Sequence, residues 1–142
     1  MTIFKKIISM FFCVFLLAGC TADREIYEYI GESDNWKAVY KYEVEYLKNG
    51  LNHSTNDIKI TYIGDMGKIR NGTAIEYTFD IGGRSGSDIL KVENNGEHIE
   101  IHTSAGSDRG FNSATFHGSE IGIMTVSWDG KYEEFEIKNT KK

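Results

Sequence analysis

A two-residue alternation of apolar and polar side chains constrains the fold of this chain more than any other feature. It begins at Trp36 and continues to Tyr46, with lysines and glutamates filling most of the positions between the apolar residues. Successive side chains of a β-strand point to opposite faces of the sheet. The segment is therefore predicted to be a long strand with one face against a hydrophobic core.

The same alternation recurs further along the chain, separated by turns rich in glycine and asparagine. Strands are predicted around residues 58–62, 73–81, 89–92, 99–103, 111–116, 124–128 and 135–137. Asn94-Asn95-Gly96 and Asp129-Gly130 are hairpin signals, because asparagine, aspartate and glycine accept positive φ at low cost. About eight short strands and no helix predict an all-β antiparallel sandwich of immunoglobulin-like type, and a small β-barrel is the alternative.

The N-terminus carries a different pattern, which predicts a signal helix ahead of the β domain. Lys5 and Lys6 precede the uncharged apolar residues 7–17. Such a segment is long enough to enter a bilayer but too short to span it permanently, as expected of a secretory signal peptide. An uncut signal anchor is the alternative.

The residues that close this segment, Leu17-Ala18-Gly19-Cys20, resemble the lipobox of bacterial lipoproteins. The resemblance implies cleavage before Cys20 and acylation of its sulfur, so that acyl chains hold the protein on the extracytoplasmic face of the cell membrane. Residues 1–19 are then the signal peptide, 20–29 the lipidated cysteine and a short tether, 30–138 one sandwich domain, and 139–142 a tail.

Charge and cysteine content exclude several functions. Without the two lysines of the signal peptide, 14 basic side chains face 21 acidic ones, which gives a formal charge of −7. An acidic surface disfavours nucleic acid, which requires a basic face to displace counterions. The only other cysteine is Cys13, within the signal peptide. The mature domain therefore lacks a disulfide framework and a thiol nucleophile, and packing must stabilise it.

The segment Gly31-Glu32-Ser33-Asp34-Asn35-Trp36-Lys37 is similar to a motif of small uncharacterised lipoproteins of Gram-positive bacteria. That resemblance implies no activity. Ser33, Asp34 and Asn35 can fold their side chains onto the local backbone, which would fix the angle at which Trp36 enters the core.

Aromatic residues are concentrated in the first part of the mature chain: Tyr27, Tyr29, Trp36, Tyr40, Tyr42 and Tyr46. Flat rings with polar tips can stack on sugars or peptides. Because most of them share one alternating face opposite charged residues, core packing is the main interpretation and a surface platform the alternative.

Two clusters are candidate ligand sites. His98, Glu100 and His102 share one face of a predicted strand, and residues two apart on a strand can reach one zinc or copper ion, with His117 as a further ligand. Two segments predicted as loops, 82–88 and 104–110, repeat a Gly-Ser-Asp core that could bind an anion or calcium. Their candidate residues are Ser87, Asp88, Ser107, Asp108 and Arg109.

No catalytic motif is present: the chain has neither a Gly-x-Ser-x-Gly elbow nor a Ser-x-x-Lys pair. The sequence therefore predicts a non-catalytic binding or interaction module at the cell envelope, without a cofactor, whose partner is a protein or the cell wall. A lipoprotein that binds a small ligand or a metal is the alternative, and a hydrolase is the least expected function.

Overall fold

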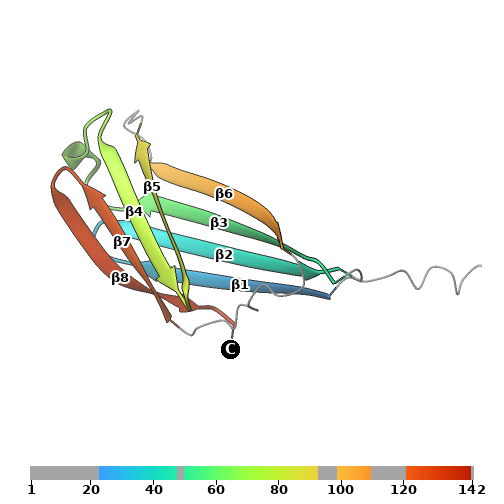
Figure 1. The fold of residues 1–142 in the computed structure, drawn as a ribbon. Helices are drawn as coiled ribbons and strands as arrows, with labels where there is room; N and C mark the ends of the chain where they lie inside the picture. Colours follow the sequence, from blue (N-terminus) through green and yellow to red (C-terminus); the bar gives the residue numbers. More distant parts are fainter. Residues whose placement is uncertain (1–22, 48–49, 93–98, 110–120, 142) are drawn as a thin grey trace, which may run out of the picture.

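The structure, a computed structural model, describes residues 23–47, 50–92, 99–109 and 121–141 (Figure 1). These residues form eight strands and one short 3-10 turn, Met66–Lys68. The strands are β1 (Asp23–Glu32), β2 (Trp36–Tyr46), β3 (Asn52–Tyr62), β4 (Ala74–Ile81), β5 (Arg84–Lys91), β6 (Glu100–Arg109), β7 (Ile121–Trp128) and β8 (Lys131–Asn139).

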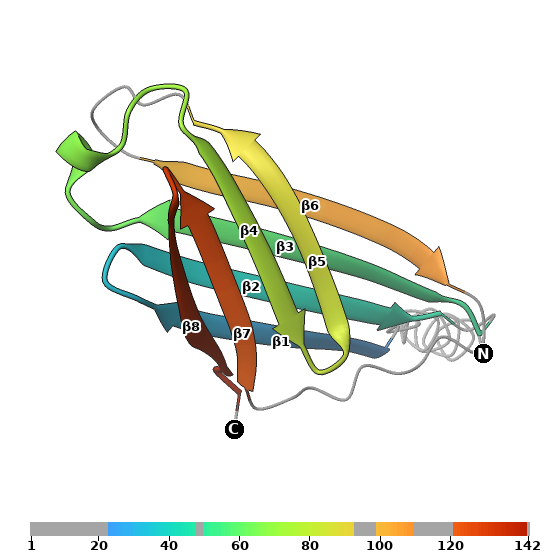
Figure 2. The same ribbon diagram turned by 60° about the vertical axis from the view of Figure 1, so that its left-hand side comes forward.

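All eight strands belong to one antiparallel sheet in the order β5-β4-β7-β8-β1-β2-β3-β6. The sheet folds over itself, so that β1, β2, β3 and β6 form one layer and β4, β5, β7 and β8 cross it as a second (Figure 2). Only two residue pairs, Tyr29–Asn139 and Ile30–Lys138, join the layers between β1 and β8. The predicted antiparallel sandwich is confirmed. Because both layers belong to one continuous sheet, the architecture is intermediate between an immunoglobulin-like sandwich and a small barrel, the two alternatives that the sequence left open.

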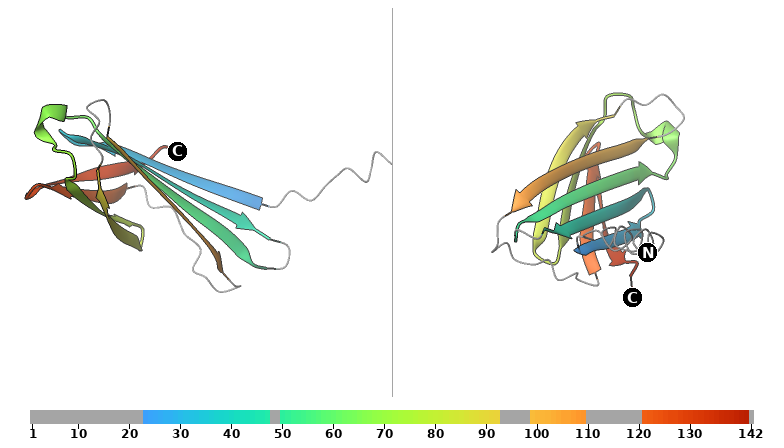
Figure 3. Two further views of the ribbon diagram at one scale, coloured as in Figure 1. Left: turned by 90° about the horizontal axis from the view of Figure 1, so that it is seen from above. Right: turned by 90° about the vertical axis from the view of Figure 1, so that its right-hand side faces the viewer.

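The first layer is longer than the second. β2 and β3 have eleven residues each, whereas β4, β5 and β7 have eight. Seen from above, β1, β2 and β3 reach past the second layer on one side (Figure 3). Residues 23–27, 42–46 and 52–56 form this extended half, which Arg84 at the start of β5 contacts at Tyr42.

The hydrophobic core fills the space where the layers overlap. Trp36 is completely buried, and its ring lies 4.9 Å from that of Tyr62 and 5.4 Å from that of Trp128, both in edge-to-face geometry. Tyr40 packs between Tyr29 and a ring of the second layer, Phe79, with centroids 6.0 and 5.1 Å away. The core-packing interpretation is therefore confirmed for the aromatic residues at this end of the strands.

The first strand starts earlier than the sequence indicated. β1 begins at Asp23, whereas residues 20–29 were expected to be a tether. Two of its inward-facing residues, Asp23 and Glu25, are polar and lie on the extended half. The apolar alternation that indicates a strand is therefore absent at the start of β1. At the other end of the chain, Thr140 donates a backbone hydrogen bond of 2.8 Å to Glu28, so the expected tail partly continues the sheet.

Both segments predicted as Gly-Ser-Asp loops are largely strands. Only Gly82 and Gly83, with φ of 56° and 83°, form a turn, and the residues that follow belong to β5. The second segment belongs to β6. Both are edge strands of the sheet, where a small residue needs to pack against one neighbour only. The ring of Phe79 lies over Gly86, so that an added Cβ would come within 2.6 Å of it.

The turn between β1 and β2 is attached to the second layer. Ser33 Oγ donates a hydrogen bond of 2.6 Å to a carboxylate oxygen of Glu133, and the Asn35 backbone N–H donates to the same oxygen at 3.1 Å. The Asn35 side-chain amide binds the other oxygen. Ser33 Oγ also lies 3.3 Å from the backbone N of Trp36, which confirms part of the predicted local capping. We call Ser33, Asn35 and Glu133 the carboxylate clamp.

Replacing Glu133 by glutamine is expected to lower the free energy of unfolding at neutral pH by about 1.5 kcal/mol, since charged hydrogen bonds are lost. Burial raises the pKa of Glu133, but the hydrogen bonds from Ser33 and Asn35 outweigh it, so the pKa is lowered overall from 4.5. The charged form therefore stabilises the fold fully above pH 4.5, and this contribution disappears as the pH falls through the lower folded pKa.

Denaturant unfolding of the wild type and Glu133→Gln at several pH values measures this effect. Their difference in unfolding free energy should be largest near pH 7 and shrink towards pH 3. Glu134→Gln, on the exposed face of the same strand, is the matched control and should leave stability unchanged. A difference that stays constant with pH would contradict the role of the carboxylate.

Candidate functional site

The inner face of the extended half carries a cluster of tyrosines around the buried Val44. Strand pairing sets Tyr27 opposite Tyr42 and places Tyr46 at the end of the same row on β2. Glu25 lies two positions from Tyr27 and shares its face, and Arg84 reaches the cluster from the second layer. We call Glu25, Tyr27, Tyr42, Tyr46 and Arg84 the tyrosine face.

A carboxylate connects two of the rings. Glu25 Oε2 accepts a hydrogen bond of 2.8 Å from the Tyr27 hydroxyl and one of 3.3 Å from the Tyr46 hydroxyl. The rings of Tyr27 and Tyr42 are stacked, with centroids 6.4 Å apart and planes inclined by 27°. Tyr27 and Tyr46 are half-buried and Glu25 is exposed, so this part of the face is accessible to solvent.

Arg84 contributes a positive charge from the start of β5. Its Nη2 donates a hydrogen bond of 2.8 Å to the Tyr42 hydroxyl, and its guanidinium carbon lies 3.9 Å from the centroid of the Tyr42 ring. A guanidinium over an aromatic face is a cation–π contact. The tyrosine face therefore combines residues of both layers, with the carboxylate of Glu25 at one end and the guanidinium of Arg84 at the other.

The hydroxyls of Tyr27 and Tyr46 remain protonated at neutral pH. The hydrogen bond to Glu25, together with burial, raises the pKa of Tyr27 to about 12. Burial, followed by the nearby charge of Glu25, raises the pKa of Tyr46 as well. Both hydroxyls therefore act as hydrogen-bond donors and acceptors rather than as phenolate nucleophiles.

The neighbouring strand adds polar groups to the same surface. Asn52 pairs with Tyr46 and Asn56 pairs with Tyr42, so both asparagines share the inner face. They are half-buried, and each amide supplies both donors and an acceptor. Flat rings beside amides form a surface that can stack on a ligand and hydrogen-bond its edge.

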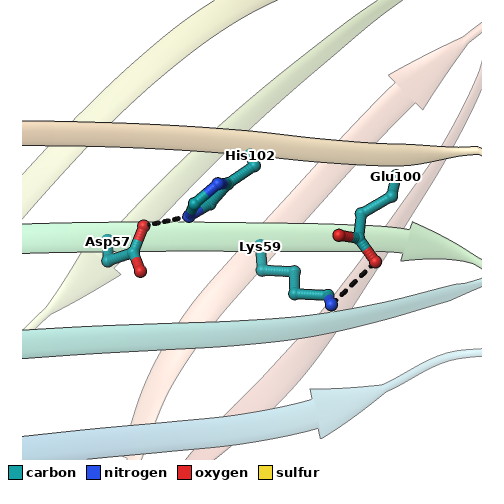
Figure 4. A network of polar contacts seen from close by, with 4 residues as sticks. All are labelled: Asp57, Lys59, Glu100 and His102. Carbon is teal, nitrogen blue, oxygen red and sulfur yellow. Dashed lines mark hydrogen bonds and ion pairs between the residues drawn. The ribbon is translucent and has the colours of Figure 1, made fainter.

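The predicted metal site is not assembled among the described residues. His98 and His117 lie outside them. Glu100 and His102 share the outer face of β6, but Glu100 forms an ion pair of 2.7 Å with Lys59 and His102 Nε2 lies 2.5 Å from Asp57 (Figure 4). Within the described ranges, no group of three histidine, cysteine or acidic side chains is arranged to hold a metal ion.

The two Gly-Ser-Asp segments are on strands at opposite ends of the sheet order, so the pairing does not join them. Ser87 and Asp88 belong to β5, and Asp88 accepts a hydrogen bond of 2.8 Å from the backbone of Ile89. The backbone of residues 107–109 belongs to β6, while the side chains of Ser107, Asp108 and Arg109 lie outside the described part.

Cys20 and the signal segment 1–19 also lie outside the described residues. In the part of the chain that the structure covers, no helix has the length and apolar character needed to cross a bilayer.

Sequence reasoning missed two members of the tyrosine face. Glu25 shares the odd-numbered register of Tyr27 and Tyr29, and extending that register backwards would have found it. Nothing in the sequence indicates that Arg84 reaches Tyr42, because the two residues belong to different layers.

Fold and site together define an all-β antiparallel sandwich with an aromatic, hydrogen-bonding surface on its longer layer. A scan against models of known protein families finds no match to this chain. A search of curated proteins finds no relative either.

Proposed function

We propose that this protein is a lipid-anchored, extracytoplasmic binding module of a Gram-positive bacterium, and that the tyrosine face is its contact surface. The observation that carries the proposal is the half-buried pair Tyr27 and Tyr46, whose hydroxyls Glu25 holds in place. Rings oriented in this way lose little conformational entropy when a ligand binds, because they are already ordered.

The chemistry of the surface favours a carbohydrate of the cell wall as the partner. A sugar ring offers a flat C–H face to stack on tyrosine and a rim of hydroxyls that both donate and accept hydrogen bonds. Asn52, Asn56 and Glu25 supply matching groups around the rings. Neutral tyrosine hydroxyls, rather than an activated nucleophile, support binding without catalysis.

Co-sedimentation with purified peptidoglycan tests the contact surface. The double variant Tyr27→Ala, Tyr46→Ala is expected to bind at least about tenfold more weakly, because each lost ring contact is worth on the order of 1 kcal/mol. Tyr132→Ala is the matched control, since this tyrosine is 73% exposed on β8 of the second layer. Equal binding by both variants would refute the assignment of the tyrosine face.

The anchor is tested by metabolic labelling with a fatty-acid analogue. The wild type should take up label and fractionate with membranes, whereas Cys20→Ala should lose the label and the firm attachment, because two or more acyl chains are needed for stable anchoring. Cys13→Ser removes the other cysteine and should keep both properties. A Cys20→Ala variant that still takes up label would show that acylation is elsewhere or absent.

A further inference from the structure

We propose that the free edge of β6 pairs with the same edge of a second copy of this chain. The two strands run antiparallel about a two-fold axis at Thr103, so that residues 100–106 of one copy lie opposite residues 106–100 of the other. The contact joins two sheets into one through an isologous interface, in which both copies contribute the same residues. It is separate from the tyrosine face and does not depend on the anchor.

The backbone of β6 carries a row of hydrogen-bonding groups along its free edge. Among the described strands, β6 is the last in the sheet order and pairs with β3 alone. Opposite residues of an antiparallel pair alternate between hydrogen-bonded and non-hydrogen-bonded positions. Tyr62 N–H donates to the Ile99 carbonyl at 3.0 Å, so the odd-numbered residues of β6 bond to β3. The N–H and C=O groups of residues 100, 102, 104 and 106 therefore point away from β3.

The side chains leave this edge unprotected. Natural edge strands are often blunted by lysine, by proline or by an inward-pointing charge. Glu100 and His102 are the titratable residues of this stretch, and both turn towards β3, where they form ion pairs with Lys59 and Asp57 (Figure 4). The next four residues, 103–106, are small and uncharged, and three of them are exposed. No feature of the stretch therefore hinders the approach of another strand.

The opposite edge of the sheet, β5, is protected in the way that β6 is not. Arg84 and Lys91 occupy its two ends. Asp88 takes an inward position opposite the buried Tyr77, yet its own side chain is exposed. A strand added beside β5 would remove water from this carboxylate, which opposes pairing there. Of the two edges, β6 is therefore the one at which a further strand can pair.

The sequence of β6 is complementary to itself in the register centred on Thr103. Thr103 lies opposite its own copy at a non-hydrogen-bonded position, where side chains approach most closely, and threonine pairs across strands are favourable. Ile101 lies opposite Ala105, and Glu100 lies opposite Gly106, so no two like charges meet. A strand of another protein would need to supply this pattern, whereas a second copy already carries it.

The edge also has room for the incoming strand. A hollow of about 360 Å³ lies between residues 90–92, where β5 ends, and residues 99–102 of β6. Because consecutive residues from both faces of β6 line it, the hollow runs along the edge of the strand. In the register centred on Thr103, this part of the edge receives Ala105 and Gly106 of the second copy, which have the smallest side chains of the stretch.

The symmetry of the pairing has a consequence for binding, which rests on the proposed function. A two-fold axis normal to the joined sheet keeps the inner faces of both first layers on the same side. Two tyrosine faces would then be open to one polymeric ligand, and binding at the first would raise the effective concentration of the ligand at the second.

Disulfide trapping in cells tests the pairing. Single cysteines are introduced into the full chain carrying Cys13→Ser, the cells are treated with a mild oxidant, and dimer is measured on non-reducing gels against Cys13→Ser alone. Thr103→Cys is expected to trap most of the chain as dimer, because Cα atoms at such a position lie about 4.5 Å apart, within reach of a disulfide. Ala105→Cys is expected to trap little, because four residues of strand, about 14 Å, separate its two sulfurs.

Ser87→Cys, at an exposed position of edge strand β5, is the matched control for random collision and should remain at the baseline. Ser104→Pro, added to Thr103→Cys, removes an N–H that faces the free edge and leaves the hydrogen bonds to β3 in place. It should lower the dimer at least about tenfold while circular dichroism shows an unchanged sheet.

Several results would overturn the proposal. Equal trapping at Ser87 and Thr103 would indicate collision, and trapping at Thr103 that survives Ser104→Pro would exclude pairing through the backbone. A Thr103→Cys chain that stays monomeric would show that the edge is unoccupied. Trapping of that cysteine only to a different protein would give the edge another partner.

Discussion

Trp36→Ala is expected to lower the free energy of unfolding by about 3–5 kcal/mol, as is usual when a large buried aromatic residue is truncated. Trp36 is 0% exposed and contacts the rings of Tyr62 and Trp128, so it joins strands β2, β3 and β7 at one end of the core. Natural domains are stable by only about 5–15 kcal/mol, so the variant should be close to unfolding. Urea denaturation followed by circular dichroism measures the loss.

Two further variants separate the cavity from other effects. Trp36→Phe should lower the free energy of unfolding much less than Trp36→Ala, because most of the ring volume remains. It also removes the indole N–H, which has no hydrogen-bond partner in the described part of the chain. Tyr132→Ala, at an exposed position, should change stability by less than about 0.5 kcal/mol. If Trp36→Phe were as damaging as Trp36→Ala, the cavity explanation would fail.

Gly31→Ala is expected to lower the free energy of unfolding by at least about 3 kcal/mol, at the upper end of the range for overpacking a well-packed site. A Cβ at Gly31 would collide with the carbonyl oxygen of Glu136 and would also approach Ile137 to 2.9 Å. The carbonyl belongs to the backbone of β8, so it cannot turn away as a flexible side chain can. The clash lies at the seam between β1 and β8, which has only two residue pairs.

Opening of this seam should be visible in hydrogen exchange, with faster exchange of the backbone amides of Tyr29 and Ile30 in Gly31→Ala than in the wild type. Gly106→Ala is the matched control on edge strand β6, where an added Cβ would meet its nearest atom at an ordinary 3.6 Å. It should be neutral or slightly stabilising, because alanine restricts the unfolded chain. Equal losses in the two glycine variants would contradict a specific role for the seam.

The candidate site was only partly predictable. Sequence alternation placed the tyrosines of β2 on one face, and core packing was the natural interpretation of that face. It holds for Trp36 and Tyr40, which lie where the layers overlap, but Tyr27 and Tyr46 are half-buried on the extended half. The difference arises because the second layer has shorter strands and crosses the first at an angle, and neither property is encoded in the period of β2.

By itself, the sequence determined the all-β class of this protein and which side of its clearly alternating strands faces inward, because a period of two leaves no choice of face once one side is apolar. Only the tertiary structure decided which strands became edges, which residues meet across the layers and where the first layer extends beyond the second. Glu133 meets Ser33, and Arg84 meets Tyr42, across 100 and 42 positions of chain. Such contacts depend on the order in which the strands pair, and no local pattern of residues specifies that order.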